Sequence, residues 1–179
     1  MRYPDEHKDA VRARIVEAAS RALRRSGLDG VSIPALMKKA GLTHGGFYAH
    51  FSDRDELVAE AVRHAALETA EEVFESAPTL DEALARYLSV AHADRPDHGC
   101  VVAALGADAP RQHAPVRRAF GWAAAGLLQL VQEKLDSRQK SPSDEALALT
   151  SRMVGAIVLA RLLDDPRLIA RLLAVARRR

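Results

Sequence analysis

The chain has 179 residues, which fits one domain or two small ones, and 48% of them are hydrophobic while only 4% are aromatic. Residues 1–54 hold ten Lys/Arg against six Asp/Glu, a net charge of +4, whereas the remainder carries −2, so a polyanionic partner is favoured for the first part only. No apolar run approaches the roughly 20 residues that span a bilayer, and the first residues lack the apolar core of a signal peptide, which predicts a cytoplasmic protein with no membrane partner.

Helix-forming residues dominate the sequence, and no segment alternates β-branched and polar residues, so an all-α fold is predicted. A first helix is expected over residues 6–26, where Val11, Ile15 and Leu23 share one face. Gly27 follows this helix, and glycine is the usual residue just past a helix end.

Two short helices joined by a tight turn are predicted over residues 31–51. Ser32 can cap the first helix, Pro34 fits its first turn, and Gly41 can close it in a left-handed conformation. Thr43 then caps a second helix that is rich in aromatic residues. This is the helix-turn-helix pattern, in which the second helix enters the DNA major groove, although a plain helical hairpin has the same turn chemistry.

The rest of the chain predicts longer helices separated by polar or proline-containing breaks, and about nine helices in all. The functional boundary is expected near Arg54, between a helix-turn-helix DNA-binding domain at 1–53 and a helical ligand-sensing and dimerisation domain at 54–179. The later helices are expected from Asp53, with Glu56 as its capping-box partner, to about Glu75, from Leu80 to about His92, from Val101 to Leu105, from Pro115 to Leu135, from Ser143 or Asp144 to about Leu163, and from Asp165 and Pro166 into the basic tail at 177–179.

With these helices in order, the chain resembles the TetR-type (tetracycline-repressor-like) transcriptional regulators. The resemblance rests on AGLTHGGFYAHFSDRDEL at 40–57, preceded by RARIVEAASRALRRSG and VSIPALMKK, and GCVVAALGAD at 99–108 adds a looser similarity. It implies a dimeric repressor with a three-helix DNA-binding head, a ligand pocket and a four-helix dimer interface. In that family, ligand changes the distance between the two heads and releases DNA.

Roles on DNA can be assigned along the second short helix. Thr43 at its start can meet a phosphate with the helix dipole behind it, and the next turn faces base edges. Gly45 and Gly46 suit a close approach of the backbone, although a loop spacer also explains them; the family usually has a bulkier polar residue at Gly46, so water and DNA shape are expected to add to the readout. Phe47 and Phe51 are expected in the core. The candidate DNA-contacting residues are Ser32, Lys38, Thr43, His44, Gly45, Gly46, Tyr48, His50 and Arg54, with a solvated surface as the alternative for Lys38.

An apolar cavity between the middle helices is expected to bind a small organic inducer, since cavities between bundle helices often have this role. The alternative is that the same side chains simply fill the core. The candidate pocket residues are Phe74, Tyr87, Leu88, Leu105, Phe120, Trp122 and Leu127.

Cys100, the single cysteine, offers a second way of sensing. Positive charge and a helix N-terminus both activate thiols, and some family members that resemble the GCVVAAL segment use such a cysteine. A buried, inert cysteine is the alternative. Arg95, His98, Arg111 and His113 are near it in sequence as candidate activating groups. A metal site from His92, His98, Cys100 and Asp94 or Asp97 is a third possibility, although solvated loop histidines explain these residues more simply.

The last two predicted helices carry broad apolar faces that would promote aggregation unless covered. Two helices from each chain would form a four-helix interface with two-fold symmetry, which predicts a homodimer and a palindromic operator. Packing on the chain's own core is the alternative. The candidate interface residues are Leu147, Val154, Ile157, Val158, Leu162, Leu168 and Leu172.

No phosphate-binding glycine loop, HExxH motif or nucleophile with its base stands out, so no enzyme, cofactor or metal is predicted. A protein that compacts DNA would bind all DNA alike, whereas a regulator needs a specificity ratio of about 10³ or more. The sequence therefore predicts a dimeric repressor that occludes a promoter and is released by a small molecule, with thiol-based redox or electrophile sensing through Cys100 as the alternative.

Overall fold

The computed structural model describes residues 5–41, 43–136 and 138–178, and within these ranges the chain forms nine α-helices and no strand, as predicted. The α-helices are α1 (Asp5–Ser26), α2 (Ile33–Lys39), α3 (Arg54–Thr69), α4 (Leu80–Tyr87), α5 (Val90–Asp94), α6 (Val101–Leu105), α7 (Ala114–Leu135), α8 (Asp144–Leu162) and α9 (Pro166–Ala176). The shorter 3₁₀ and π segments are η1 (His44–Ala49), η2 (Ala70–Glu75), η3 (Pro96–His98) and η4 (Gly106–Arg111).

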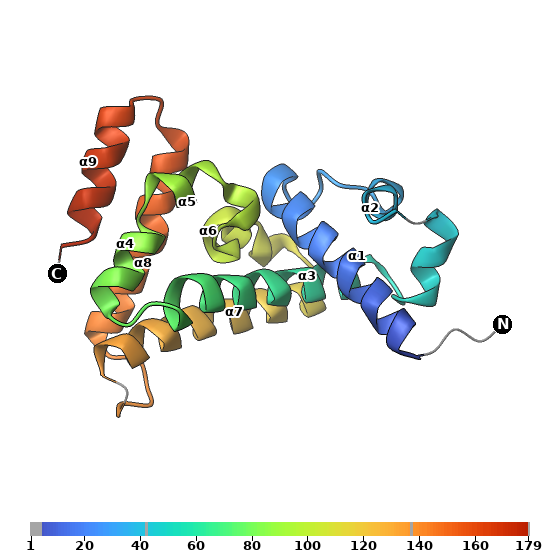
Figure 1. Cartoon of the computed structure of the whole chain (residues 1–179), viewed down its shortest axis with the longest axis horizontal. Helices are drawn as coiled ribbons and strands as arrows, with labels where there is room; N and C mark the ends of the chain where they lie inside the picture. Colours follow the sequence, from blue (N-terminus) through green and yellow to red (C-terminus); the bar gives the residue numbers. More distant parts are fainter. Residues whose placement is uncertain (1–4, 42, 137, 179) are drawn as a thin grey trace.

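Figure 1 shows an elongated molecule with α1 and α2 at one end and the α8–α9 hairpin at the other. The long helices α3 and α7 pack side by side between the two ends. We call the part formed by α1, α2 and η1 the head, and the remainder the body. Within the described ranges, no helix is both long and apolar enough to cross a bilayer.

The head begins and ends its helices at the predicted residues. Ser32 caps α2, since its Oγ accepts from the backbone N–H of Ala35 at 3.4 Å, and Pro34 lies in the first turn. Gly27 and Gly41 have φ angles of +83° and +74°, where a residue with a side chain would be strained, so glycine closes both helices.

The second helix of the predicted pair is the 3₁₀ segment η1 rather than an α-helix. Gly46 N–H donates to Thr43 O at 3.1 Å and His50 N–H donates to Phe47 O at 2.9 Å, the i to i+3 bonds of the tighter helix. Thr43 has the extended backbone of a cap, but its side chain makes no capping hydrogen bond. Two successive glycines, each costing about 1 kcal/mol in an α-helix, explain the difference.

The long helix α3 starts at its predicted cap and ends in a π turn. Asp53 Oδ1 accepts from Glu56 N–H at 2.8 Å, as predicted. In return, the Glu56 carboxylate accepts from the N–H of Ser52 at 2.7 Å, whereas a capping box would use the N–H of Asp53. At the far end, α3 continues into η2, where Ser76 N–H donates to Glu71 O at 3.2 Å, an i to i+5 bond.

The helix predicted from Leu80 to His92 is in fact two helices. Leu88 leaves helical geometry, with φ −90° and ψ 51°, and Ser89 then caps α5 by accepting from His92 N–H at 3.1 Å. A serine inside an apolar pattern can restart a helix because its hydroxyl satisfies an orphan amide. This break turns α5 toward α8 and α9.

The later helices follow the predictions closely. Ser143 caps α8 by accepting from Ala146 N–H at 3.2 Å, and Asp165 caps α9 by accepting from Arg167 N–H at 2.8 Å. Two apolar clusters hold the molecule together, one joining the head to α3, α6 and the first half of α7, the other joining the second half of α7 to α4, α8 and α9. Helix α7 therefore belongs to both cores and ties the head to the α8–α9 end.

Candidate nucleic-acid interface and ligand cavity

Two buried phenylalanines pack beneath the exposed surface of η1. Phe47 and Phe51 are 0% and 2% exposed and stack with ring centroids 5.5 Å apart, which confirms them as core residues. Tyr48 is 66% exposed, and its ring meets that of Phe47 edge-on at 5.2 Å. The tyrosine is thus held from below while most of its side chain faces solvent.

Neither glycine of η1 is required by the fold. An added Cβ at Gly45 would meet nothing within 4 Å, and at Gly46 it would meet only Met37 Cε at 3.7 Å and Thr43 Oγ1 at 3.8 Å, which are ordinary contacts. Neither glycine has a positive φ. Because both weaken the helix without serving its packing, close approach of another molecule to this backbone is the simplest reason for them.

Three other candidate DNA-contacting residues of the head are exposed at the surface: Ser32, Lys38 and Thr43. The side chain of His44 lies outside the part of the chain that the structure describes. The exposed residues lie on α2 and at the start of η1, the two elements that pack together in the head. They can therefore contribute to one interface with Tyr48.

Two further candidates are partly used by the fold. Arg54 donates from its guanidinium to the carbonyl oxygen of Leu28, which ties the start of α3 to the loop after α1. His50 is half-buried, and its pKa is lowered by burial and then by the positive charges of Lys8 and Arg12. Both are therefore less free to contact a phosphate than the exposed residues.

An ion cluster that sequence reasoning missed fastens η1 to the rest of the molecule. Arg12 of α1 donates to Glu56 Oε1 at 2.7 Å, to Glu60 Oε2 at 3.2 Å and to the carbonyl oxygen of His50. Its guanidinium also lies 4.2 Å from the ring centroid of Phe51. We call this group the Arg12 cluster. Its acids lie 44 and 48 residues from the arginine, so no local pattern could have indicated it.

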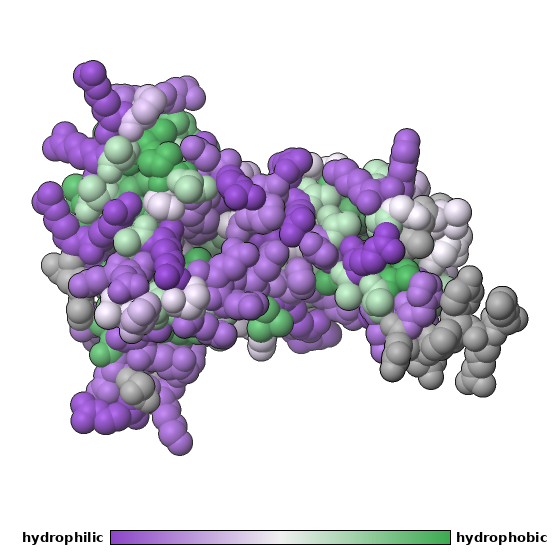
Figure 2. Space-filling view, in the orientation of Figure 1, coloured by the Kyte–Doolittle hydropathy of each residue, from purple (hydrophilic) through white to green (hydrophobic). Residues whose placement is uncertain are grey.

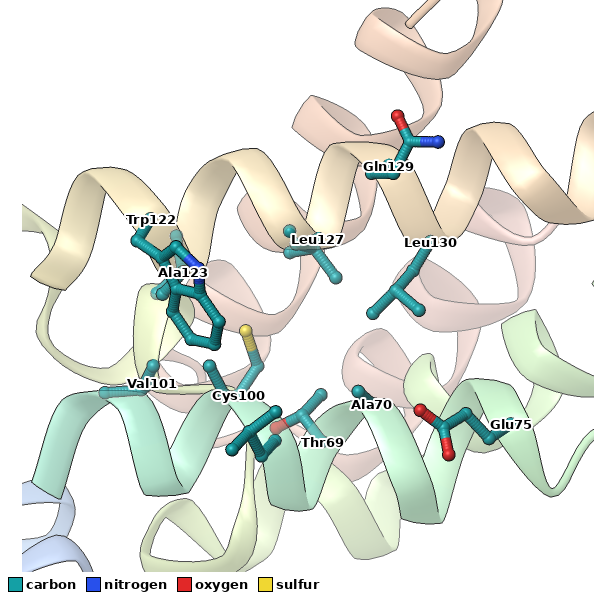
Figure 3. A pocket seen from close by; sticks show the side chains of 14 residues that line it. Thr69, Ala70, Glu75, Cys100, Val101, Trp122, Ala123, Leu127, Gln129 and Leu130 are labelled. Carbon is teal, nitrogen blue, oxygen red and sulfur yellow. The ribbon is translucent and has the colours of Figure 1, made fainter. Parts of the chain in front are cut away.

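The body contains a cavity of about 270 Å³ between α3 and α7 (Figure 3). Helix α3 and segment η2 form one wall, α7 forms the opposite wall, and the start of α6 closes the inner side. The lining is predominantly apolar, with a few polar groups, as is typical of small-molecule sites. Two of the seven predicted pocket residues, Trp122 and Leu127, line it.

The other five predicted pocket residues do not line this cavity. Four are core residues, because the parts of η2, α4 and α6 that carry them pack against neighbouring helices. The fifth borders a separate, more open hollow beside η4. The four are Phe74, Tyr87, Leu88 and Leu105, and the fifth is Phe120. The sequence pattern showed that these residues are apolar and inward-facing, but not which side of each helix meets the cavity.

Cys100 forms part of the cavity wall although it is only 3% exposed, and Figure 3 shows its sulfur between α3 and α7. His92 holds the adjacent backbone, since its Nε2 accepts from the N–H of Cys100 at 2.9 Å and its Nδ1 donates to Tyr87 O at 2.5 Å. Burial lowers the pKa of His92 to about 4, so the ring is neutral, with its proton on Nδ1.

Two buried polar atoms near the thiol lack good hydrogen-bond partners in the described structure: Tyr87 Oη and Arg161 Nη1. Arg161 reaches this place from α8, donating from Nε to Ala93 O at 3.2 Å and from Nη2 to His92 O at 3.3 Å. Burial, and then the neighbouring Cys100, raise the pKa of Tyr87 well above its usual range. The thiol therefore has a polar neighbourhood inside an apolar core.

Two of the four activating groups predicted around Cys100 have acidic partners of their own. Arg111 pairs with Asp108, and His113 pairs with Asp55 at 2.8 Å, so the nearby cation comes instead from α8. The alternative metal site also fails, since within the described ranges no three His, Cys, Asp or Glu side chains are arranged to hold an ion.

The α8–α9 hairpin presents an unusually apolar surface, visible as green atoms at that end of the molecule in Figure 2. Leu162 is 74% exposed, although it is a large apolar side chain. Ile157 does not belong to this face, because it is completely buried in the core of its own chain. Val154 and Leu172 are half-buried. The exposed members are Leu147, Val158, Leu159, Leu162, Leu168 and Val175, of which Leu147, Val158, Leu162 and Leu168 were predicted interface residues.

Comparison with known proteins gives a match in sequence for the head and in fold for nearly the whole chain. A family model described as bacterial regulatory proteins, tetR family, matches residues 15–61. The HTH-type transcriptional regulator TtgR of Pseudomonas putida is 32% identical over 82 residues, which are 46% of this chain and 39% of that protein. The uncharacterised HTH-type transcriptional regulator YfiR of Bacillus subtilis is 35% identical over 52 residues, 29% of this chain and 25% of that one. The matches thus span about two fifths or less of these curated relatives.

Among solved structures, the reduced form of E. coli NemR superposes with a TM-score of 0.75 at 18% identity, covering 93% of this chain and 95% of that one. A TetR transcriptional regulator from Chloroflexus aurantiacus gives a TM-score of 0.71 at 21% identity, with coverages of 96% and 94%. The multidrug binding protein EbrR complexed with imidazole gives 0.63 at 24% identity and 92% of both chains. At these identities the likeness concerns the fold.

Proposed function

We propose that this chain, whose residues 15–61 match the tetR family model, is a dimeric DNA-binding regulator that represses transcription and is released by a small organic inducer. The observation that carries the proposal is the exposed η1 surface. There Tyr48 packs on the buried Phe47 ring, next to two glycines that the fold does not require. We propose the head, residues 1–53, as the DNA-binding part and residues 54–179 as the sensing and dimerising part.

Helix α3 supports the link between sensing and DNA binding. Its first turns hold the head through the Arg12 cluster, in which Glu56 and Glu60 bind Arg12. Its last turn, at Ala66 and Thr69, lines the cavity. A ligand that binds more tightly when α3 is in one position than in another would therefore also shift the head. Such a difference in affinity between two positions is what ligand-driven release requires.

Replacing Tyr48 by alanine should weaken operator binding about tenfold while the fold survives, because the lost side chain is largely exposed. Thr43→Ala should act in the same direction. The measurement is fluorescence anisotropy on DNA from around the protein's own gene, at fixed salt and with excess nonspecific competitor. The melting temperature of each variant controls for folding.

Unchanged affinity of both variants would contradict the proposed interface. Wild-type protein that binds all DNA alike, without a specificity ratio of about 10³, would instead contradict the regulator proposal. Arg54→Ala gives a separate readout, since loss of a phosphate contact lowers the salt dependence of binding by about one unit of slope. Because Arg54 also bonds to Leu28, its variant must be compared at matched stability.

The exposed hairpin face supports a two-fold dimer in which α8 and α9 of each chain form a four-helix interface. Leu162→Glu should produce a monomer, because a charge at a residue that is 74% exposed leaves the single chain intact but would be buried in the dimer. Sedimentation velocity measures this directly. Tyr48→Ala, at the opposite end of the molecule, is the matched control and should remain dimeric; a dimeric Leu162→Glu protein would exclude this face.

Thiol sensing through Cys100 is a second candidate, favoured by the position of its sulfur on the cavity wall, where the buried groups of Tyr87 and Arg161 are its polar neighbours. An electrophile such as N-ethylmaleimide would form an S–C bond, while the thiol proton is transferred to the other carbon of the double bond. If this is the inducing event, N-ethylmaleimide should release wild-type protein from DNA and leave the Cys100→Ser complex bound. Release of both proteins alike would exclude the thiol as the sensor.

A further inference from the structure

The cavity between α3 and α7 has two chemically different ends (Figure 3). Trp122 and Cys100 lie at one end and Glu75 at the other, with Leu127 and Leu130 between them. A molecule that fills this space would place an apolar body against the leucines and the indole ring. Its other end would meet a carboxylate.

Glu75 is the single charged residue among those that line the cavity. Within the described ranges, no Lys, Arg or His side chain forms an ion pair with it. The nearby cations have other acceptors, since Lys134 donates to Ala77 O at 2.5 Å and Arg86 donates to the Ser76 hydroxyl. Glu75 is exposed to solvent at this end of the cavity, which therefore offers a negative charge that no cation of the described residues neutralises.

The π turn of η2 explains why this acid faces the cavity. Ala66 lines the cavity, and in an uninterrupted α-helix a residue nine positions later would lie about two and a half turns away, on the opposite face. The i to i+5 bonding of η2 instead puts about one wide turn between Ala70 and Glu75, and both line the cavity. Rare π turns often occur at functional sites, and here the turn changes which side chain meets the ligand space.

We propose that the inducer of this protein is an organic cation, with a compact apolar body between Leu127 and Trp122 and its positive group paired with Glu75. The inference rests on the proposed function of the cavity as the inducer site. A cavity of about 270 Å³ is roughly twice the size of one that holds a benzene ring, so a body of about a dozen non-hydrogen atoms fits. Neutral molecules of the same shape gain no attraction from the carboxylate, which is exposed to solvent, and anions are repelled by it.

Three probes of the same length separate these cases: 4-phenylbutylammonium, 4-phenylbutanol and 4-phenylbutyrate. Trp122 is the chain's single tryptophan, so fluorescence excited at the indole reports directly on the cavity. The ammonium should bind about tenfold more tightly than the alcohol, and the carboxylate should bind more weakly than both. In Glu75→Gln the ammonium should lose this advantage, while the affinity for the alcohol stays the same.

Glu72→Gln is the matched control, because Glu72 is an exposed acid of the same segment that does not line the cavity, and this variant should keep the preference for the ammonium. Equal affinity for the three probes, no binding of any of them, or an unchanged preference in Glu75→Gln would overturn the proposal. The titration uses the protein without DNA, so it is independent of the regulator proposal. A protein that selects the ammonium but shows no specific DNA binding would retain the cation site and lose the regulatory role.

Discussion

Arg12→Met should lower the free energy of unfolding by about 2 kcal/mol and weaken operator binding about tenfold. Methionine keeps the apolar stem but removes the guanidinium that bonds to Glu56, to Glu60 and to the carbonyl of His50. Two acids on successive turns of α3 then repel each other, and the end of η1 loses its anchor. Urea titration and anisotropy on the same preparations measure the two effects.

Arg21→Met is the matched control, because Arg21 also lies on α1 and forms an ion pair with Glu17. The side chains of Arg21 and Glu17 are 44% and 45% exposed. Exposed pairs of this kind contribute about 0.3–0.5 kcal/mol, so this variant should behave almost like the wild type. Equal losses in the two variants would mean that the Arg12 cluster has no special role. A loss of stability without a loss of operator affinity would mean that it does not orient η1.

The Arg12 cluster also predicts how stability changes with pH. The pKa of Glu56 is lowered from 4.5 to about 2, first by the N–H of Ser52 and then by Arg12. A depressed carboxyl pKa stabilises the folded state above pH 4.5, and this contribution is lost as the pH falls toward 2. The stability difference between wild type and Arg12→Met should therefore narrow over that range.

Much of the fold was predictable because helix ends are local. Ser32, Asp53, Ser143 and Asp165 each satisfy an amide two or three residues away, so the cap and its partner are close in the sequence. Two helices were predicted wrongly: η1 is a 3₁₀ segment rather than an α-helix, and the helix expected from Leu80 to His92 is broken after Tyr87. The causes are also local, but the same residues were compatible with a continuous α-helix at both places. The Arg12 cluster depends on the packing of α1 against α3, which no spacing encodes.

The cavity was less predictable than the fold because its lining depends on the rotation of each helix. Apolar character alone could not separate Leu127, which lines the space, from Leu88, which fills the core. Glu75 was missed because a continuous α-helix would direct it away from Ala66, and only the π turn brings both to one face. Likewise, Arg161 reaches the neighbourhood of Cys100 through the fold rather than through sequence proximity.

Gly99→Ala should lower the free energy of unfolding by about 2 kcal/mol and weaken binding in the cavity. An added Cβ would lie 2.7 Å from Arg161 Nη2 and 2.7 Å from the His92 ring. Both side chains are held in place, the arginine by the carbonyls of His92 and Ala93 and the imidazole by Tyr87 and by the N–H of Cys100. Making room for one methyl group must therefore break buried hydrogen bonds and move the cavity wall at Cys100.

Gly121→Ala separates this steric effect from the general effect of replacing glycine. An added Cβ at Gly121 meets nothing within 4 Å, and the residue lies inside α7, so alanine should stabilise the protein by up to about 1 kcal/mol. Gly99 has φ −91° and ψ −179°, a backbone conformation that alanine also adopts. A loss of stability in Gly99→Ala would then arise from the contact with Arg161 and His92, whereas a gain like that of Gly121→Ala would mean that these side chains move aside freely. In that case the side chains around Cys100 would rearrange easily. The rigid cavity wall that both the inducer proposal and the thiol proposal require would then be absent.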